Sequence, residues 1–230
     1  MLLTWWRTAP WLTVSTAVGL AILLTLGTWQ VQRLQWKEAL IAEIEAGLSA
    51  PPRPLPVDGS SLDRLNYHRV SVRGRLLHDR EQSLGPRQHT RQPGRHLLTP
   101  MALSDGRHLL VNRGWLPERP GDADVARPAG DLELTGVLRT GFRRGTFTPD
   151  YDAGAAMWFW YDIDGISART GLTLLPAVLE ADDDGEGLPF GGVTEVNIAN
   201  NHLHYALTWY GLAAALICVF VIFQRQRSAA

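Results

Sequence analysis

Two long apolar stretches lie near the two ends of the sequence, and a polar region with shorter hydrophobic patterns separates them. The first stretch, Thr8 to Gln32, contains no charged side chain, and its apolar part runs from Trp11 to Trp29. The second, Asn197 to Gln224, lacks Asp, Glu, Lys and Arg, and its apolar part runs from Tyr205 to Phe223. Each apolar part is long enough for a helix that crosses a hydrocarbon core of roughly 30 Å. The pattern therefore predicts two transmembrane helices.

A cleaved signal peptide is the alternative interpretation of the first stretch. Its apolar run is longer than a usual signal-peptide core, and no clear small-residue cleavage site follows it. Tryptophans at positions 5, 6, 11 and 29 are of the kind that gathers at membrane–water interfaces. We therefore expect the segment to be retained as a membrane helix.

The helical pattern continues beyond the first apolar stretch, over residues 33–48. Apolar side chains recur there every four residues, at Trp36, Leu40, Ile44 and Leu48. Such a stripe is typical of a stalk helix packed on its own domain, and the alternative is a helix at the interface beside His202. The prolines within residues 51–56 then end the helix and predict a stiff, extended connector.

A period of two residues begins at Tyr67 and marks a region of short strands. The expected strands cover residues 67–76, 81–84, 97–103, 109–116, 132–138, 176–180 and 193–198. Ser104-Asp105-Gly106 has the chemistry of a hairpin turn, and Asp162 or Asp164 is placed to cap a short helix from Ile163 to Thr170. The expected fold is an α+β membrane protein: two transmembrane helices flank an extracytoplasmic antiparallel β-barrel or sandwich-like domain with one or two short helices.

These elements divide the chain into four parts. Arg225 and Arg227 follow the second apolar stretch, whereas residues 180–204 contain no Lys or Arg. By the positive-inside rule, both termini are expected in the cytoplasm and the central domain outside it. The parts are a cytoplasmic N-terminus with the first transmembrane helix (1–32), a stalk helix and Pro-rich connector (33–56), an extracytoplasmic β domain (57–200), and the second transmembrane helix with a cytoplasmic tail (201–230).

The composition narrows the classes of function. The 230 residues include 22 Lys and Arg and 23 Asp and Glu, and this balance argues against a nucleic-acid-binding protein. The single cysteine excludes an intramolecular disulfide and cysteine-based zinc sites. No nucleophile-elbow, zinc-protease, P-loop or dinucleotide motif is present, so a hydrolase is only a weak alternative function. The acidic run Asp182–Asp184 lacks the spacing of a calcium-binding loop.

The most distinctive polar chemistry lies where the second apolar stretch begins. At about 100° per residue, one helix face carries His202, Tyr205, Ala206, Trp209 and Ala213. A neutral imidazole is a good axial ligand for haem iron. His202 is therefore a candidate haem ligand, with Tyr205 and Trp209 beside the ring, whereas His204 points about 200° away. The alternative is an interfacial histidine that is hydrogen-bonded to the preceding domain.

Two arginines are candidates for binding acidic groups such as haem propionates. Arg33 follows the first apolar stretch and Arg113 follows the predicted hairpin, and a guanidinium pairs well with a carboxylate. The alternative for each is an arginine that snorkels or forms an internal salt bridge. If both membrane helices border the same domain, then Gln30, Arg33 and Trp36 lie at about the depth of His202. The aromatic run Trp158–Trp160 is either a ligand platform or part of a core.

Five motifs follow one another along the chain: Gly27-Thr28-Trp29-Gln30-Val31-Gln32-Arg33-Leu34-Gln35-Trp36-Lys37, Leu110-Val111-Asn112-Arg113-Gly114-Trp115, Phe147-Thr148-Pro149-Asp150, Trp158-Phe159-Trp160 and Asn201-His202-Leu203-His204-Tyr205-Ala206-Leu207-Thr208-Trp209. Together they resemble the Surfeit locus protein one family, the assembly factors of cytochrome c oxidase. The resemblance covers nearly the whole chain. It implies a non-enzymatic protein of a bacterial plasma (inner) membrane.

The resemblance also implies a cargo and partners. Bacterial members of the family look like haem a-binding proteins that assist placement of haem in the catalytic subunit of a haem–copper oxidase. His202 matches the family histidine proposed to bind haem, and His204 falls at a variable position. Membrane lipid and the haem a synthesis machinery are further expected partners.

The alternative function is a membrane scaffold that stabilises an oxidase subunit intermediate without binding haem. Small residues that would permit close packing of the two helices are Ala17, Ala21, Thr25, Gly211 and Ala215. The scaffold hypothesis predicts that substitution of His202 has little effect on oxidase assembly.

Overall fold

The chain forms two compact units in a computed structural model that describes residues 10–57, 61–118, 125–183, 185, 187–194, 196 and 198–229. One unit, the helix unit, comprises Met1–Glu43 together with Asn197–Ala230. The other, the sheet unit, comprises Ile44–Val196. The predicted cytoplasmic N-terminal residues 1–9 lie outside the described residues.

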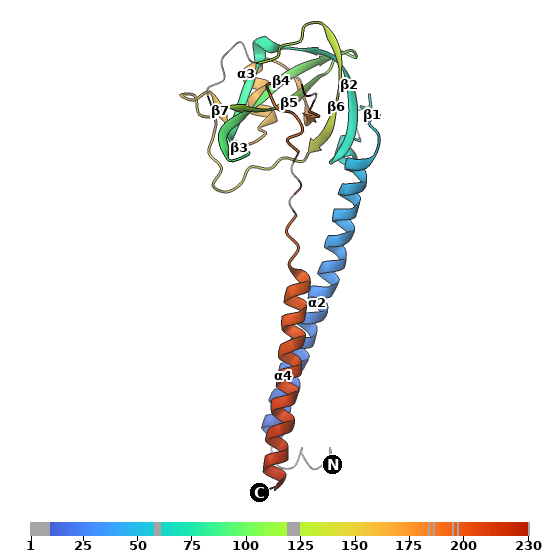
Figure 1. The fold of residues 1–230 in the computed structure, drawn as a ribbon, viewed down its shortest axis with the longest axis vertical. Helices are drawn as coiled ribbons and strands as arrows, with labels where there is room; N and C mark the ends of the chain where they lie inside the picture. The colour runs from blue at the N-terminus through green and yellow to red at the C-terminus, as the bar shows by residue number, and fades with distance from the viewer. Residues whose placement is uncertain are drawn as a thin grey trace. The chain divides into compact units, whose positions relative to one another are not determined.

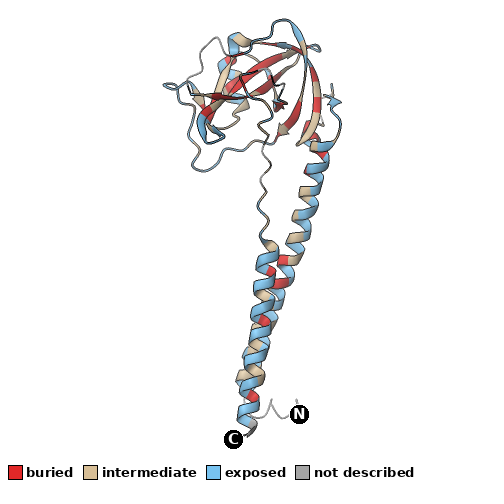
Figure 2. Cartoon of the chain, in the orientation of Figure 1, coloured by how far each residue is buried: buried red, intermediate tan, exposed pale blue. Residues whose placement is uncertain are grey.

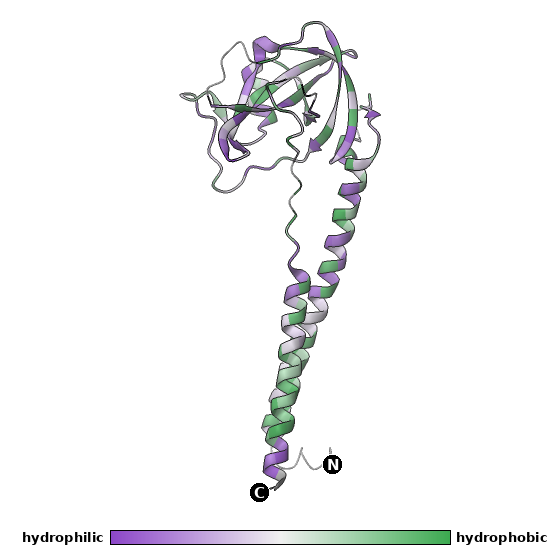
Figure 3. Cartoon of the chain, viewed as in Figure 1, coloured by the Kyte–Doolittle hydropathy of each residue, from purple (hydrophilic) through white to green (hydrophobic). Residues whose placement is uncertain are grey.

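The helix unit contains α2 (Pro10–Ser49) as far as Glu43 and α4 (His202–Ala229), and within this unit the two helices lie side by side (Figure 1). The predicted membrane helix and stalk helix are one continuous helix, and it ends just before the first proline of the connector. Both helices are long and apolar enough to cross a membrane, by length and composition (Figure 3). The charged residues of α2 are confined to its C-terminal part, after Gln32.

α2 and α4 run antiparallel along a narrow seam. Gly19 faces Leu216, and Gly27 faces the ring of Tyr210, so the numbering falls on one helix as it rises on the other. A Cβ atom at Gly27 would lie 2.7 Å from a ring carbon of Tyr210, and therefore only glycine leaves room for this ring. The Tyr210 hydroxyl then lies 3.2 Å from the Thr28 hydroxyl.

The prediction of which small residues lie between the two helices was wrong. Three of the predicted small residues on α2 and α4, Ala17, Ala21 and Ala215, are exposed, and Gly211 faces open space. The buried small residues on α4 are instead Ala206 and Ala213. The seam therefore uses another face of the helices, on which the Tyr210 ring fills the space beside Gly27.

The sheet unit is built on one eight-stranded sheet. Its strands are β1 (Arg53–Pro54), β2 (His68–Leu76), β3 (Gln82–His89), β4 (Gln92–Leu103), β5 (His108–Pro117), β6 (Asp131–Thr140), β7 (Met157–Trp158) and β8 (Leu174–Ala181). The short helices are η1 (Leu62–Leu65), η2 (His78–Arg80) and α3 (Ile163–Thr170). The strand order is β1-β2-β6-β8-β5-β4-β3-β7, and β2 also pairs with β4.

The sheet is mixed, so the prediction of a purely antiparallel sheet was wrong. The pairs β1–β2, β3–β7 and β5–β8 are parallel, and the other pairs are antiparallel. A parallel pair needs a long connection between its strands, and β6, β7 and α3 supply that connection between β5 and β8. Alternating hydrophobicity identifies a strand but not the direction of its partner.

The β4–β5 hairpin confirms the predicted turn. Met101 pairs with Leu109 across it, and Gly106 has φ +86°, a conformation that favours glycine. Hydrogen bonds from the Arg107 side chain hold the pKa of Asp105 below its usual range. The strand ends at Pro117, as the missing proline N–H predicts.

The segment predicted as a last strand, 193–198, is not one among its described residues. Gly192 donates its backbone N–H to the carbonyl of Ala181, and the Thr194 hydroxyl donates to Glu180. These bonds fasten the segment to the end of β8 instead of extending the sheet.

Buried side chains of the sheet unit form three clusters, and Figure 2 marks the buried stretches of the strands in red. The largest cluster joins η1 to β2, β4, β5, β6 and β8. A second cluster holds α3 on the sheet and contains Trp158, which is 5% exposed. Trp158 is therefore a core residue. The Asp162 side chain accepts a hydrogen bond from Gly165 N at 3.0 Å and caps α3, one of the two caps predicted.

Candidate functional site

The helix unit brings His202 against Gln30. Nδ1 of His202, at the first residue of α4, lies 2.7 Å from Oε1 of Gln30 on α2. Gln30 is 9% exposed, and Thr28, Gln32 and Arg33 are its neighbours along α2, so the contact lies where the apolar part of the helix gives way to polar residues. The two residues lie at the same level of the helix pair, and the direct contact adds a partner that the sequence did not assign to His202.

The contact fixes the tautomer of a neutral His202. The Gln30 oxygen can only accept a hydrogen bond, so the proton of the imidazole lies on Nδ1. Nε2 then carries the lone pair, and His202 has no second hydrogen-bond partner among the described residues. A histidine whose Nδ1–H is held by an oxygen is the usual arrangement of a metal-binding imidazole.

The aromatic residues predicted beside His202 differ in their surroundings. Trp209 is half-buried, whereas Tyr205 is 52% exposed. The Tyr205 ring lies edge-on to that of His204, with centroids 6.2 Å apart. Tyr205 therefore faces outward from the seam, and it offers a surface to whatever surrounds α4 rather than a wall of a closed pocket.

Arg33 lies three residues beyond Gln30 on α2, which places it on nearly the same side of the helix. Its guanidinium carbon stacks 3.9 Å from the centroid of the Trp36 ring. The side chain is exposed and forms no ion pair within the described part of the chain. The guanidinium edge is therefore available for an acidic group while its face rests on an indole.

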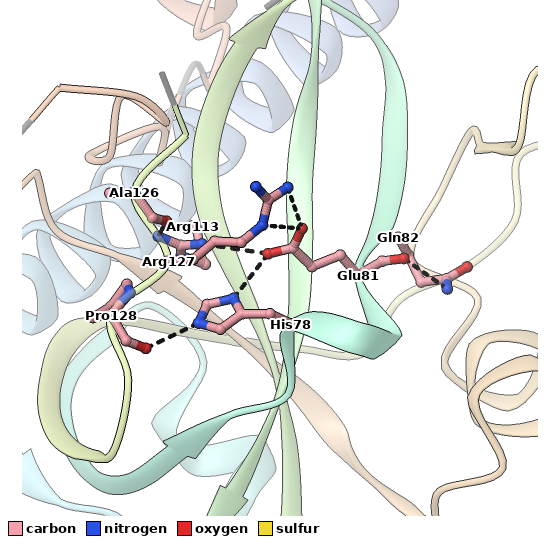
Figure 4. Close-up of polar contacts among 7 residues, drawn as sticks. All are labelled: His78, Glu81, Gln82, Arg113, Ala126, Arg127 and Pro128. Carbon is pink, nitrogen blue, oxygen red and sulfur yellow. Dashed lines mark hydrogen bonds and ion pairs between the residues drawn. The ribbon is translucent and has the colours of Figure 1, made fainter. Parts of the chain in front are cut away.

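Arg113 belongs to the sheet unit, and its contacts there are internal (Figure 4). Nη1 lies 3.5 Å from Glu81 Oε1, and Nη2 donates to the Ala126 carbonyl at 2.5 Å. His78 and Arg127 approach the same carboxylate, at 2.9 and 3.1 Å. With 9% of its side chain exposed, Arg113 fits the alternative of an internally salt-bridged arginine.

No group of three or more His, Cys, Asp and Glu side chains within the described ranges is arranged to hold a metal ion. A haem iron needs only a single axial residue from the protein, so a haem site at His202 requires no cluster of this kind. The predicted site residues thus divide between the units: His202, Tyr205, Trp209 and Arg33 in the helix unit, and Arg113 in the sheet unit.

Comparisons with known proteins agree with the family that the motifs indicated. A model of the SURF1 family matches residues 17–214. The SURF1-like protein of Monosiga brevicollis is 37% identical over 217 residues, which are 87% of this chain and 83% of the relative. Surfeit locus protein 1 is 38% identical in Rattus norvegicus over 210 residues and 36% in Homo sapiens over 211; each match covers 83% of this chain, and 68% and 70% of the relatives. The chain belongs to the SURF1 family.

Proposed function

We propose that this chain is a membrane-anchored assembly factor for a haem–copper oxidase, and that it carries haem a as cargo on His202. The observation that carries the proposal is the hydrogen bond between His202 Nδ1 and Gln30 Oε1, which leaves Nε2 with its lone pair. Family membership supports the assembly role, and the imidazole supports the haem role. The proposal assigns no chemical transformation to the protein.

The surroundings of His202 suit a ligand that must be passed on. A single protein ligand holds a porphyrin less tightly than two ligands would. Trp209 and the exposed Tyr205 offer aromatic surface for the macrocycle. Arg33, whose charge is not neutralised by a described carboxylate, is the candidate for a propionate. Arg113 is not needed, because its guanidinium already binds Glu81 and a backbone carbonyl.

The membrane location belongs to the same proposal. α2 and α4 have the length and composition of membrane-crossing helices. The arginines beyond the apolar part of α4 favour both termini in the cytoplasm, with the sheet unit outside a bacterial plasma membrane. The proposed receiver of haem is the catalytic subunit of the oxidase, and the haem a synthesis machinery is the proposed donor.

The direct test is a visible absorption spectrum. The full chain is purified in mild detergent from cells that make haem a, alongside His202→Ala, His204→Ala and Gln30→Leu. We expect a Soret band in the wild-type protein and in His204→Ala, and none in His202→Ala. Gln30→Leu should retain the ligand but lose about tenfold or more in haem affinity, because the imidazole loses its orienting partner.

Circular dichroism of each variant is the control for folding. A Soret band lost in His204→Ala and kept in His202→Ala would show that His204, and not His202, is the haem ligand. No haem in a folded wild-type protein, despite haem a in the cells, would favour the alternative, a scaffold that stabilises an oxidase subunit intermediate without haem.

A further inference from the structure

The sheet unit contains a pocket of about 810 Å³ that takes no part in the proposed haem site. Its lining comes from several strands and includes Arg87, His89, His96, Trp115, Arg139 and Tyr161. Pockets that hold small organic molecules commonly measure about 300–1,000 Å³. The size is therefore suitable for a small ligand, and the lining indicates which kind.

A buried hydrogen-bond network supports the pocket. Asn112 is fully buried on β5, and its side-chain amide donates to His96 Nδ1 at 3.0 Å and to the Tyr161 hydroxyl at 2.7 Å. Its oxygen accepts from Gly114 N at 3.0 Å. Tyr161 in turn donates to Glu180 Oε1 at 3.1 Å. Every member has a defined donor or acceptor role, so the network holds these side chains in one arrangement.

The network determines what His96 can offer. Nδ1 accepts from Asn112, so the proton of the neutral imidazole lies on Nε2. Burial, followed by the charge of Arg87, lowers the pKa of His96 from 6.5 to about 4. At neutral pH, His96 is therefore an uncharged residue with one N–H to donate.

The acidic residue in the lining is already neutralised. Arg139 lies 3.4 Å from Glu180 Oε2, and the Thr194 hydroxyl donates to the same oxygen at 2.7 Å. Arg139 also donates to the Tyr67 hydroxyl at 3.0 Å. Because the Tyr161 hydroxyl donates to its other oxygen, both carboxylate oxygens of Glu180 have partners within the sheet unit. The charge of Glu180 is therefore balanced without a bound cation.

Two further arginines in the lining, Arg87 and Arg91, form no ion pair with any described residue. Arg87 is half-buried and donates only to the carbonyl of Pro86, at 3.1 Å. After burial, its charge is the second cause of the lowered pKa of His96, so it acts on the polar interior of the pocket. The described lining therefore carries positive charge in excess of its one carboxylate.

Aromatic rings border the cationic part of the pocket. The rings of His89 and Trp115, both in the lining, are tilted with centroids 5.3 Å apart, and Phe190, which is outside the lining, stacks beside both at 5.5 and 6.1 Å; these three rings are the aromatic group. Flat rings favour contact with a flat, apolar face of a ligand. A tetrahedral inorganic anion would leave that surface uncovered.

We propose that this pocket binds a small, flat organic carboxylate, with its carboxylate at Arg87 and its planar body against the aromatic group. A guanidinium fork matches a carboxylate in a bidentate manner, and the excess positive charge selects an anion over its neutral analogue. The neutral His96 provides an additional donor without adding charge. The site is separate from His202 and does not depend on the proposed haem function.

Isothermal titration calorimetry of the full chain in mild detergent tests the proposal with benzoate and its neutral isostere benzamide. We expect benzoate to bind with one site per chain, and benzamide at least about tenfold more weakly, a difference of roughly 1.4 kcal/mol. Arg87→Gln should weaken benzoate binding by about tenfold or more, and Arg87→Lys by less, because the charge stays but the fork is lost.

The matched control is Arg64→Gln. Arg64 is an exposed arginine of the same unit that does not line the pocket, so its substitution removes the same charge and should leave benzoate affinity within about twofold. Equal binding of benzoate and benzamide, or no binding of benzoate, overturns the proposal. So does unchanged affinity in a folded Arg87→Gln protein, or tighter binding of inorganic phosphate than of benzoate.

Discussion

The sheet unit buries its apolar side chains in its interior, whereas the helix unit exposes many of them on its surface. In the sheet unit, Leu98 and Leu110 have no exposed surface. In the helix unit, Leu203 and Leu207 are 55% and 64% exposed, and the buried seam contains alanines and glutamine (Figure 2). The sheet unit excludes water by its own packing, whereas the helix unit presents apolar surface that a bilayer would cover.

The comparison also shows where each unit keeps its polar groups. The sheet unit buries an extended network around Asn112 and Glu180, in which His96, Tyr161 and Thr194 take part. The helix unit buries one polar contact in its seam near the start of α4, between Gln30 and His202. The Gln30–His202 contact orients one imidazole, whereas the network orients several side chains in the wall of a pocket. Three substitutions or conditions separate these behaviours.

The largest effect is expected from Gly114→Ala in β5. Gly114 has φ +125°, and a Cβ atom there would overlap the carbonyl oxygen of Phe190. Phe190 and Trp115 exchange two backbone hydrogen bonds, so neither backbone can move away freely. We expect the sheet unit to lose at least about 3 kcal/mol in its free energy of unfolding. Hydrogen exchange of β5 amides in the full chain measures the loss.

Gly130→Ala is the matched control, because Gly130 has φ +84° but nothing within 4 Å of an added Cβ. It should cost only about 1 kcal/mol, from backbone strain. The helix unit should keep its exchange rates in both variants. Equal costs at the two glycines would contradict the proposed overlap.

Acidification is expected to act next, on the sheet unit alone. Burial and then Arg87 lower the pKa of His96 from 6.5 to about 4, so between these values the unfolded chain binds a proton that the folded chain does not. The contribution to stability is therefore complete above about pH 6.5 and is lost as the pH falls through about 4. The loss is at most about 3 kcal/mol.

Unfolding of wild type and His96→Gln, followed from pH 7 to 4, checks this expectation. The variant should be less stable at pH 7 and should lose less on acidification, so that the two curves converge. Parallel curves across this pH range would show that His96 is not the group that titrates.

The smallest effect is expected in the helix unit, from Gly27→Ala. The added methyl group displaces the Tyr210 ring and its 3.2 Å contact with Thr28, which should weaken the pairing of α2 and α4 by about 1 kcal/mol. Gly211→Ala makes the same change where nothing lies within 4 Å, and it should be neutral or slightly stabilising. Faster hydrogen exchange of α4 only in Gly27→Ala is the expected result. Equal hydrogen exchange in both variants would show that Gly27 is not needed for the packing of α2 against α4.

Sequence patterns predicted the local elements well. Both long helices, the β4–β5 hairpin with its Asp-Gly turn, and α3 with its cap were identified because their signals lie within a few neighbouring residues. Strand direction and partners were not, because β5 pairs with β8 across more than fifty residues, roughly the span from Leu110 to Val178. Contacts between residues that far apart depend on the rest of the fold, and a local sequence pattern contains no information about them.

The candidate sites follow the same rule. His202 was identified from its own chemistry and its place at a helix start, but its partner Gln30 lies on the other helix. The Asn112 network was missed altogether, since its members come from four separate segments and each is ordinary in its local context. A buried asparagine within an apolar strand run was the one available signal.

The position of β8 has a consequence for the order of events during synthesis. It is the last strand along the chain, yet it pairs with β6 on one side and β5 on the other. Until residues 174–181 have left the ribosome, β5 and β6 each have an edge without its final neighbour. The sheet is therefore completed only after most of the chain has been synthesised. A chain truncated before β8 exposes unpaired backbone N–H and C=O groups on both β5 and β6, and such edges favour aggregation.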